Sequence, residues 1–210
     1  MDVAADMDVD SDVDADMDVE SDVDADMDVD SDTDADTDVD ADGDPRGSVV
    51  VNEIDYDQPG GDSAEFVELY NRGTSPVDLS LLDLVFVNGY YTPPAIYETY
   101  PLGPEVLGPG EYFVIGWSSV TTGLTCGTIT MSDTIQNGPD AVALVLADTT
   151  TIIDTVSYGG GVDGWVEGVV GAPDDDELGS IQRNPTGDDT DDNELDFEYF
   201  DTPTPCGPPL

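Results

Sequence analysis

The sequence predicts an all-β domain, a sandwich or a barrel, preceded by a long acidic tail. About eight short apolar or alternating segments follow one another from residue 48 onwards, and Gly, Pro, Asn and Asp separate them. No segment shows a run of apolar residues at helical spacing. The first 46 residues instead alternate aspartate with Val, Ala, Met, Ser and Thr. We therefore place a tail at residues 1–46 and a β domain at residues 47–210.

The tail is built from a ten-residue repeat. MDVDSDVDAD at residues 7–16 recurs with small changes at 17–26 and 27–36, and every even position from Asp6 to Asp44 is acidic. Period two suits a strand, but a strand would align these charges on one face, and Asp favours neither strands nor helices. We expect residues 1–46 to be disordered and extended by self-repulsion, as a spacer or an acidic coat.

The end of the tail raises a calcium hypothesis. Residues 38–43, DVDADG, fit the start of a calcium-binding loop. The twelfth position holds Val49, where such a loop needs a bidentate Glu. The motif is therefore incomplete, and a low-affinity calcium sponge stands as the alternative to a solvated spacer.

The β domain is predicted from its strand-like segments. In residues 64–70, Val67 and Leu69 share one face, while Phe66 shares the other with Glu68 and Tyr70. We expect the segments 140–146 and 151–158 to form a hairpin around residues 147–150. A domain of this length buries enough surface to form a core without help. The expected strands are 48–54, 64–70, 82–87, 111–116, 140–146, 151–158, 180–183 and 197–200.

The composition excludes several kinds of chemistry. The chain has 50 Asp and Glu residues, three arginines, no Lys and no His, for a formal net charge of -47. Without His or Lys there is no Ser-His or Cys-His pair, no His-ligated metal and no Schiff base. The charge disfavours nucleic acid and anionic membranes and favours cations and basic partners. No apolar stretch approaches the ~18 residues of a membrane helix, and no signal peptide follows Met1.

Cys126 and Cys206 leave two interpretations open. Their spacing gives neither a zinc motif nor a CxxC redox pair. A disulfide would close a loop of about 80 residues, staple the C-terminus and contribute about 4 kcal/mol on the loop-entropy model. It would also favour an exported protein. The alternative is two unpaired thiols.

Two acidic loops are the candidate metal sites. Carboxylates one or two residues apart raise each other's pKa, and a bound calcium would remove that cost. The alternative is a solvated acidic surface without an ion, which is also our interpretation of the run at 174–177. The candidate calcium ligands are Asp188, Asp189, Asp191, Asp192 and Glu194 in one loop and Asp55, Asp57 and Asp62 in the other.

Four tyrosines are the candidate partner-binding residues. Tyr90, Tyr91, Tyr97 and Tyr100 lie among prolines in one segment. Tyr offers a flat apolar face and a polar tip at low entropic cost, which suits recognition loops. The alternative is a loop that lies over the core.

Glu65 and Glu68 raise the hypothesis of a carboxylate hydrolase, which needs one acid and one base. Three-residue spacing on a strand puts their side chains on opposite faces. The hydrolase is therefore the remote alternative, and we expect no catalytic residues.

The ordered set of segments resembles the lamin tail domain family. The resemblance spans about residues 48–206, with two departures: Leu81-Leu82 stands where the family has Gly-Trp, and the segment 88–105 is longer. It implies an immunoglobulin-like β-sandwich without catalytic residues, and bacterial members are usually secreted or surface proteins. The matching segments are VVVNEID at 49–55, AEFVELYN at 64–71, VDLS at 77–80, LGPG at 107–110, YFVI at 112–115, GPDAVAL at 138–144, IDTVSY at 153–158 and SIQRN at 180–184.

Together these observations predict a non-catalytic binding or anchoring module of a secreted or cell-surface protein, presented on an acidic spacer. The alternative is a calcium-stabilised structural or adhesive protein. We expect a monomer with a protein or surface component as its partner. The cytoplasm of a salt-accumulating cell is the alternative location, because it also suits so acidic a chain.

Overall fold

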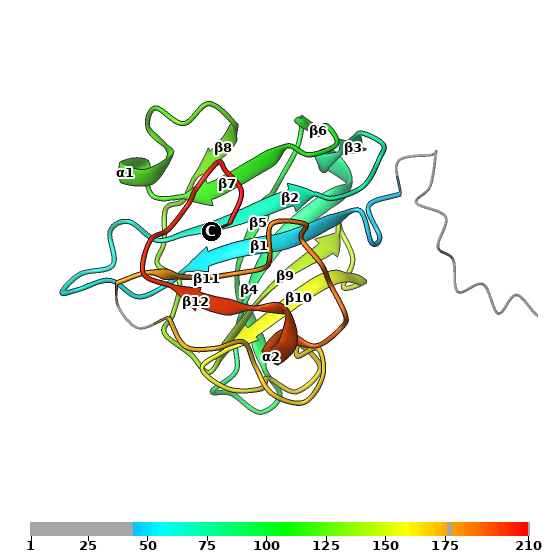
Figure 1. Ribbon diagram of the computed structural model, residues 1–210. Helices are drawn as coiled ribbons and strands as arrows, with labels where there is room; N and C mark the ends of the chain where they lie inside the picture. Colours follow the sequence, from blue (N-terminus) through cyan, green and yellow to red (C-terminus); the bar gives the residue numbers. More distant parts are fainter. Residues whose placement is uncertain (1–43, 176–177, 210) are drawn as a thin grey trace, which may run out of the picture. The chain divides into compact units, whose positions relative to one another are not determined.

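The computed structural model describes residues 44–175 and 178–209 (Figure 1). The predicted disorder and the incomplete calcium loop of residues 1–43 lie outside this part of the chain. Within it the protein is an immunoglobulin-like β-sandwich, so the predicted fold class is confirmed.

The larger sheet has six strands. All neighbours are antiparallel except β7 and β8, which are parallel. Across the sheet, the order is β12 (Glu198–Phe200), β11 (Ser180–Gln182), β1 (Val49–Asp55), β2 (Phe66–Asn71), β7 (Tyr112–Gly116) and β8 (Gly127–Thr130).

The smaller sheet has four antiparallel strands, and a two-stranded ribbon lies beside the sandwich. The sheet order is β10 (Ile152–Tyr158), β9 (Asp140–Leu146), β4 (Leu82–Asn88) and β5 (Ala95–Pro101), and the ribbon pairs β3 (Val77–Asp78) with β6 (Val106–Leu107). Three short helical turns connect these strands: η1 (Leu79–Leu81), α1 (Ser118–Thr121) and α2 (Asn193–Asp196).

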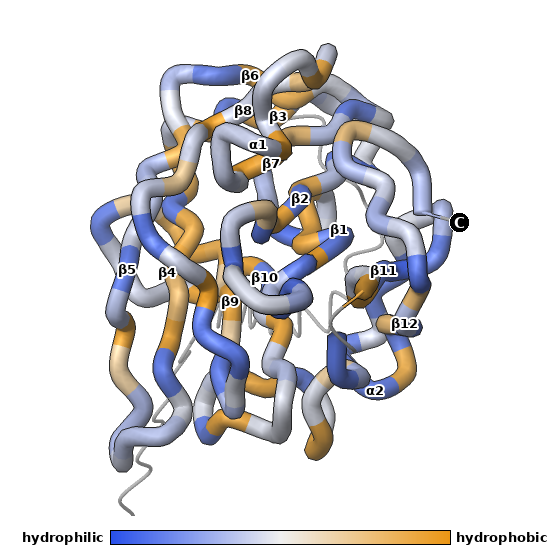
Figure 2. The backbone as a smooth tube through the Cα atoms, turned by 90° about the vertical axis from the view of Figure 1, so that its left-hand side faces the viewer, coloured by the Kyte–Doolittle hydropathy of each residue, from blue (hydrophilic) through white to orange (hydrophobic). Residues whose placement is uncertain are grey.

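The main core fills the space between the sheets. Val67 and Leu69 of β2 point into it, as their alternation predicts, and meet Leu84 and Phe86 of β4 in one apolar cluster. In Figure 2 apolar stretches mark β2, β4, β9 and β11, and polar turns separate them. Burial of this apolar surface is the dominant stabilising contribution to the fold.

A second, smaller core covers the outer face of the four-stranded sheet. Val85 and Val87 of β4 pack there with Ala143 of β9, under Val162 and Trp165 from the segment after β10. Strand β4 is therefore buried on both faces. This explains why its sequence, LDLVFVN, is apolar almost throughout instead of alternating.

The predicted strands and the hairpin of β9 and β10 are confirmed, but four strands were missed. Strands β3 and β6 have only two residues each, and β8 is a polar edge strand of sequence GTIT. Strand β5 runs through the segment predicted as a tyrosine-rich loop. Its register shifts opposite Phe86 and Val87, so its side chains do not alternate regularly.

Candidate functional site

A fully buried arginine is the centre of the most elaborate polar site. Arg183 follows β11 directly, and none of its surface is exposed. Its guanidinium lies 3.0 Å from Asp154, 3.1 Å from Asp196, 3.3 Å from Asp189 and 3.9 Å from Glu167. It also donates to the carbonyl oxygens of Val51 and Asp188, and Phe197 covers its face at 4.6 Å. We call this group the Arg183 centre.

The Arg183 centre joins four segments of the chain. Asp154 lies on β10, Glu167 in the covering segment after it, and Asp189 and Asp196 near α2. Asn193, also fully buried, ties them together. Its amide nitrogen donates to Glu167 and to the carbonyl of Thr155, while its oxygen accepts from the main-chain N–H groups of Ser157 and Glu167. All these donors and acceptors are paired, so the centre fixes the C-terminal segments against the smaller sheet.

The charges in the centre do not balance, because one guanidinium faces four carboxyl groups. Burial, reinforced by the neighbouring Asp154, raises the pKa of Glu167 to about 9. Burial also raises the pKa of Asp154, although Arg183 opposes this. Burial acts against ionisation of Asp196 too, but hydrogen bonds from Thr190 bring its pKa below 3.8. Glu167 therefore holds a proton at neutral pH, and this reduces the excess of negative charge.

The acidic loop predicted to bind calcium lies beside this centre. Asp189 contacts Arg183, Asp188 accepts a hydrogen bond from Asn184, and Asp192 caps the N-terminus of α2. Asp191 and Glu194 are exposed. Calcium binding by this loop stays a prediction. The prediction assumed that its carboxyls lack a counterion, but Asp189 already has one in Arg183.

The second acidic loop is organised by Asp175, which the sequence analysis interpreted as part of a solvated acidic run. That interpretation is wrong for Asp175, which is buried and hydrogen-bonded. Asp175 accepts hydrogen bonds from the main-chain N–H groups of Tyr56 and Asp57, and Gln58 donates to Asp55. Burial raises the pKa of Asp55 to about 8 and that of Asp175 to about 6. Asp55 is therefore a buried, largely protonated group near neutral pH. Asp57 and Asp62 are half-buried.

The two acidic loops do not combine into one cluster. In the described part of the chain, one group of three acidic side chains places its ligand atoms within 4.8 Å of one another. It consists of Asp154, Glu167 and Asp189. Only Asp189 was among the predicted ligands, and the Arg183 guanidinium contacts all three carboxyls. Arg183 is therefore the cation that these three carboxyls share in the structure.

Glu65 and Glu68 lie in separate environments. Glu65 accepts hydrogen bonds from the Trp117 indole and the main chain of Ile135, at 3.0 and 3.1 Å. Glu68 lies on the outer face of β2 and accepts from Asn52. Both are completely buried. The two carboxyl groups therefore belong to separate hydrogen-bond networks.

The four predicted tyrosines separate into two kinds. Tyr90 and Tyr91 are 84% and 59% exposed in the turn between β4 and β5. Tyr97 and Tyr100 instead pack against Phe86 in the core, and their hydroxyl groups accept from the main chain of Gln136 and Ser132. Tyr97 is half-buried and Tyr100 is buried, so Tyr90 and Tyr91 are the more accessible pair.

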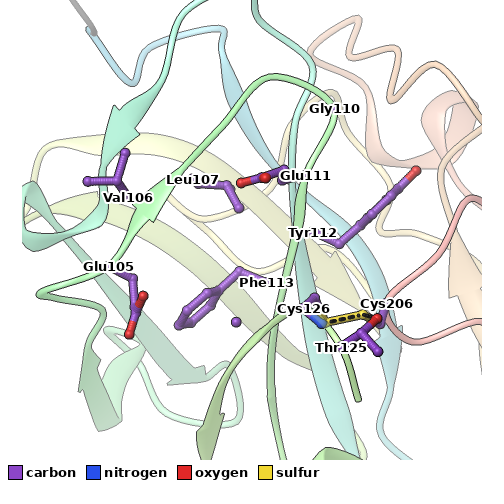
Figure 3. A pocket seen from close by; sticks show the side chains of 11 residues that line it. Glu105, Val106, Leu107, Gly110, Glu111, Tyr112, Phe113, Thr125, Cys126 and Cys206 are labelled. Atoms are coloured by element: carbon purple, nitrogen blue, oxygen red, sulfur yellow. Dashed lines mark hydrogen bonds between the residues drawn. A yellow bond between two sulfur atoms is a disulfide. The ribbon is translucent and has the colours of Figure 1, made fainter.

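The two cysteines form a disulfide at the wall of a pocket. The Cys126–Cys206 disulfide joins the loop before β8 to the C-terminal segment. The pocket beside it, about 430 Å³, has Tyr112 next to the disulfide and Glu105 and Val106 on its far side (Figure 3). Its lining is Glu105, Val106, Leu107, Gly110, Glu111, Tyr112, Phe113, Thr125, Cys126, Gly127 and Cys206. The disulfide is thus accessible from this side.

The fold and these sites define an immunoglobulin-like sandwich with a buried, hydrogen-bonded polar centre. The model of the lamin tail domain family matches residues 43–160, more than half of the sequence, and the chain belongs to this family. A comparison with curated proteins finds no match. Domains of this family are usually non-catalytic and bind proteins. Arg183, α2 and Cys206 lie beyond the matched stretch.

No helix in the described part of the chain is long and apolar enough to cross a bilayer.

Proposed function

We propose that this protein is a non-catalytic binding or anchoring module whose β4–β5 hairpin docks a basic protein partner outside the cell. The observation that carries the proposal is the exposure of Tyr90 and Tyr91, 84% and 59%, at one turn. Ile96, 42% exposed, follows on the neighbouring strand. Exposed aromatic groups that lie together are typical of protein-binding surfaces.

The charge of the chain supports the choice of partner. A formal net charge of -47 attracts basic surfaces and repels acidic ones. Electrostatic attraction mainly speeds association, while the tyrosines would supply most of the affinity once buried. The acidic tail acts in this proposal as a spacer that holds the module away from its attachment point.

The disulfide supports a location outside the cytosol. Disulfides persist in oxidising compartments and are rare where thiol reductants dominate. A secreted or cell-surface protein is therefore our proposal, and the cytoplasm of a salt-accumulating cell is the alternative. Fractionation of the producing cells, combined with thiol labelling of Cys126 and Cys206, distinguishes the two.

The docking proposal is tested with a peptide library. The full chain is passed over immobilised peptides, half with positive and half with neutral or negative net charge. We expect retention on positively charged peptides, and at least about tenfold weaker binding of the Tyr90→Ser/Tyr91→Ser variant, because loss of a central tyrosine typically costs 1 kcal/mol or more.

A matched control is Val169→Ser, because Val169 is an apolar residue, 86% exposed, in a different loop. This variant should bind like the unmodified protein. The hairpin would be ruled out as the docking surface if the double tyrosine variant bound as tightly as the unmodified protein. Retention that does not depend on peptide charge would rule it out as well.

A calcium-stabilised structural role is the second candidate. The observation that favours it is the exposure of Asp191 and Glu194 beside a centre with more carboxyls than cations. In this role calcium would bind the loop of Asp191 and Glu194 and raise Tm, whereas a loop already held by its hydrogen bonds around Arg183 would gain little stability from calcium.

A further inference from the structure

The C-terminal segment crosses the outer face of the six-stranded sheet. Residues 201–207, which we call the strap, follow β12 and run back over the sheet as the red loop in Figure 1. Two of its main-chain N–H groups donate to carboxyl groups: Thr204 to Glu53 at 2.8 Å and Cys206 to Glu68 at 2.6 Å. The Thr204 hydroxyl makes a second bond to Glu53, and Gln182 donates to the carbonyl of Thr202.

The two carboxyl groups under the strap face each other. Glu53 of β1 and Glu68 of β2 are directly paired across the strands, and both are completely buried. Like charges at such positions repel each other and destabilise a sheet. Neutral donors surround them: Ser180 and Gln182 bond Glu53, and Asn52 bonds Glu68.

No basic side chain compensates this pair. The chain has three arginines and no Lys or His. Arg46 pairs with Asp44, Arg72 donates to the carbonyls of Gly47 and Gly187, and Arg183 lies in its own centre.

Burial therefore favours the protonated form of these carboxyls, although the hydrogen bonds that they accept lower the pKa of each. It raises the pKa of Glu68 to about 8 and that of Glu53 above its usual 4.5. The titratable neighbours are Asp55 on β1, whose charge couples to Glu53, and Tyr112 on β7, which couples to Glu68. From β11 and the strap, the groups that contact the pair are the neutral donors already named.

A covalent bond holds the same strap at its far end. Cys206 is disulfide-bonded to Cys126 before β8, and the pocket of Figure 3 reaches this bond. Both cysteines are half-buried rather than enclosed. A small dithiol therefore has access to the bond.

We propose that the strap is a releasable cover with two locks, the Cys126–Cys206 disulfide and the facing carboxyls Glu53 and Glu68, and that it opens only when the disulfide is reduced and the carboxyls are ionised. Opening uncovers a surface of acidic and amide side chains. The strap is thus a conformational device that responds to redox state and pH together.

The redox step uses an external dithiol. The dithiol transfers two electrons and two protons to the disulfide. The bond between Cys126 and Cys206 breaks, each sulfur becomes a thiol, and the reductant forms a disulfide of its own.

The pH dependence has a defined sign. A carboxyl whose pKa is raised in the closed state stabilises that state fully below its usual pKa, and this contribution is lost as pH rises through the raised pKa. For Glu68 the window runs from 4.5 to about 8. The reduced strap should therefore be closed at acid pH and open at alkaline pH.

Hydrogen exchange of the full chain, corrected for the intrinsic rate at each pH, tests the proposal. In the oxidised protein we expect the amides of Thr204, Cys206 and Gly207 to be protected at pH 6 and at pH 9. In Cys126→Ser/Cys206→Ser, protection should fall at least about tenfold between these pH values, the factor that corresponds to one pKa unit. Adding Glu68→Gln should remove most of this fall.

The matched control in the same background is Glu111→Gln, which changes an exposed carboxyl and should keep the full pH dependence. If the serine variant fails to fold, the protein reduced with a dithiol is compared with Glu68→Gln reduced in the same way, so that ionisation of the two freed thiols affects both equally. Equal protection at both pH values after reduction, or loss already at pH 6, would overturn the two-lock proposal. Opening of the oxidised strap at pH 9 would do so as well.

Discussion

Removing the Arg183 guanidinium should be the most destabilising single change in the C-terminal half of the domain. Arg183→Met keeps much of the side-chain volume but leaves Asp154, Asp189 and Asp196 without the cation that lies 3.0 to 3.3 Å from them. Two main-chain carbonyls, of Val51 and Asp188, lose their donor as well.

The magnitude follows from these contacts. Removing one partner of a buried ion pair typically costs about 3–5 kcal/mol, because the other charge stays buried without compensation. Protonation of Asp154 would limit the loss, since its pKa is already raised. Against a total stability of about 5–15 kcal/mol, the loss is large. It corresponds to a decrease in Tm of about 6–20 °C for a domain of this size.

Urea denaturation of the full chain at pH 8, followed by circular dichroism, measures the change. The control is Arg72→Met, because Arg72 donates to two carbonyls at 2.9 and 3.1 Å and its loss should cost about 1 kcal/mol or less. The Arg183→Met loss should shrink at pH 4, where more of the carboxyls are protonated. A loss no larger than that of Arg72→Met, or one equal at pH 4 and pH 8, would refute the reasoning.

Three further predictions concern the other buried acids, the disulfide and calcium. Asp55→Asn should be about 1–3 kcal/mol more stable than the unmodified protein at pH 9 and equal to it near pH 4. The reason is that the pKa of Asp55 is raised to about 8 in the folded protein, so its ionisation opposes folding. Urea denaturation at both pH values measures the difference in stability, and a difference that does not change with pH would contradict the prediction. Cys126→Ser/Cys206→Ser should lose about 2–4 kcal/mol in the same assay, since it opens a loop with a sequence separation of 80; an unchanged midpoint would show that the disulfide adds no stability. In a calorimetric titration with magnesium as the control, calcium should bind the loop of Asp191, Asp192 and Glu194 weakly and leave Tm nearly unchanged. Saturable binding well below millimolar, with a rise in Tm that magnesium does not produce, would instead favour the calcium-stabilised role.

The fold was predictable because its signals are local. Alternation in β2 and the continuous apolar run of β4 each indicate a strand from a few adjacent residues. Strand β5 escaped prediction because the register shift between Ile96 and Glu98 breaks its alternation. Tyr97 and Tyr100 were therefore predicted as loop residues, although tertiary packing beside Phe86 half-buries Tyr97 and buries Tyr100.

The polar sites were less predictable because their partners are distant in the sequence. Acidic loops stand out locally, but Arg183 meets Asp154 across 29 residues and Asp196 across 13. Two signals pointed to this centre: a charged residue, Asp154, in the middle of the apolar segment 152–158, and a single arginine after Arg72 in an acidic chain. Glu53 carried no comparable signal, because its pairing with Glu68 depends on the bulge in β1.

The buried carboxyls give the domain a pH dependence that can be separated from its net charge. Burial raises the pKa of several of them, among them Glu65 to about 7, Glu68 to about 8 and Glu167 to about 9. Such groups stabilise the folded state fully below their usual pKa, and this contribution is lost as pH rises through the raised values. Stability should therefore decrease between pH 5 and pH 9.

Repulsion within a chain of net charge -47 acts in the same direction, but salt screens it. The cost of burying a charge is not screened in this way. Thermal melts at pH 5 and pH 9 in about 1 M salt, where the Debye length is about 3 Å, should therefore still show a lower Tm at pH 9. If high salt abolishes the difference, surface repulsion alone accounts for it, and the buried carboxyls are not protonated as the structure implies.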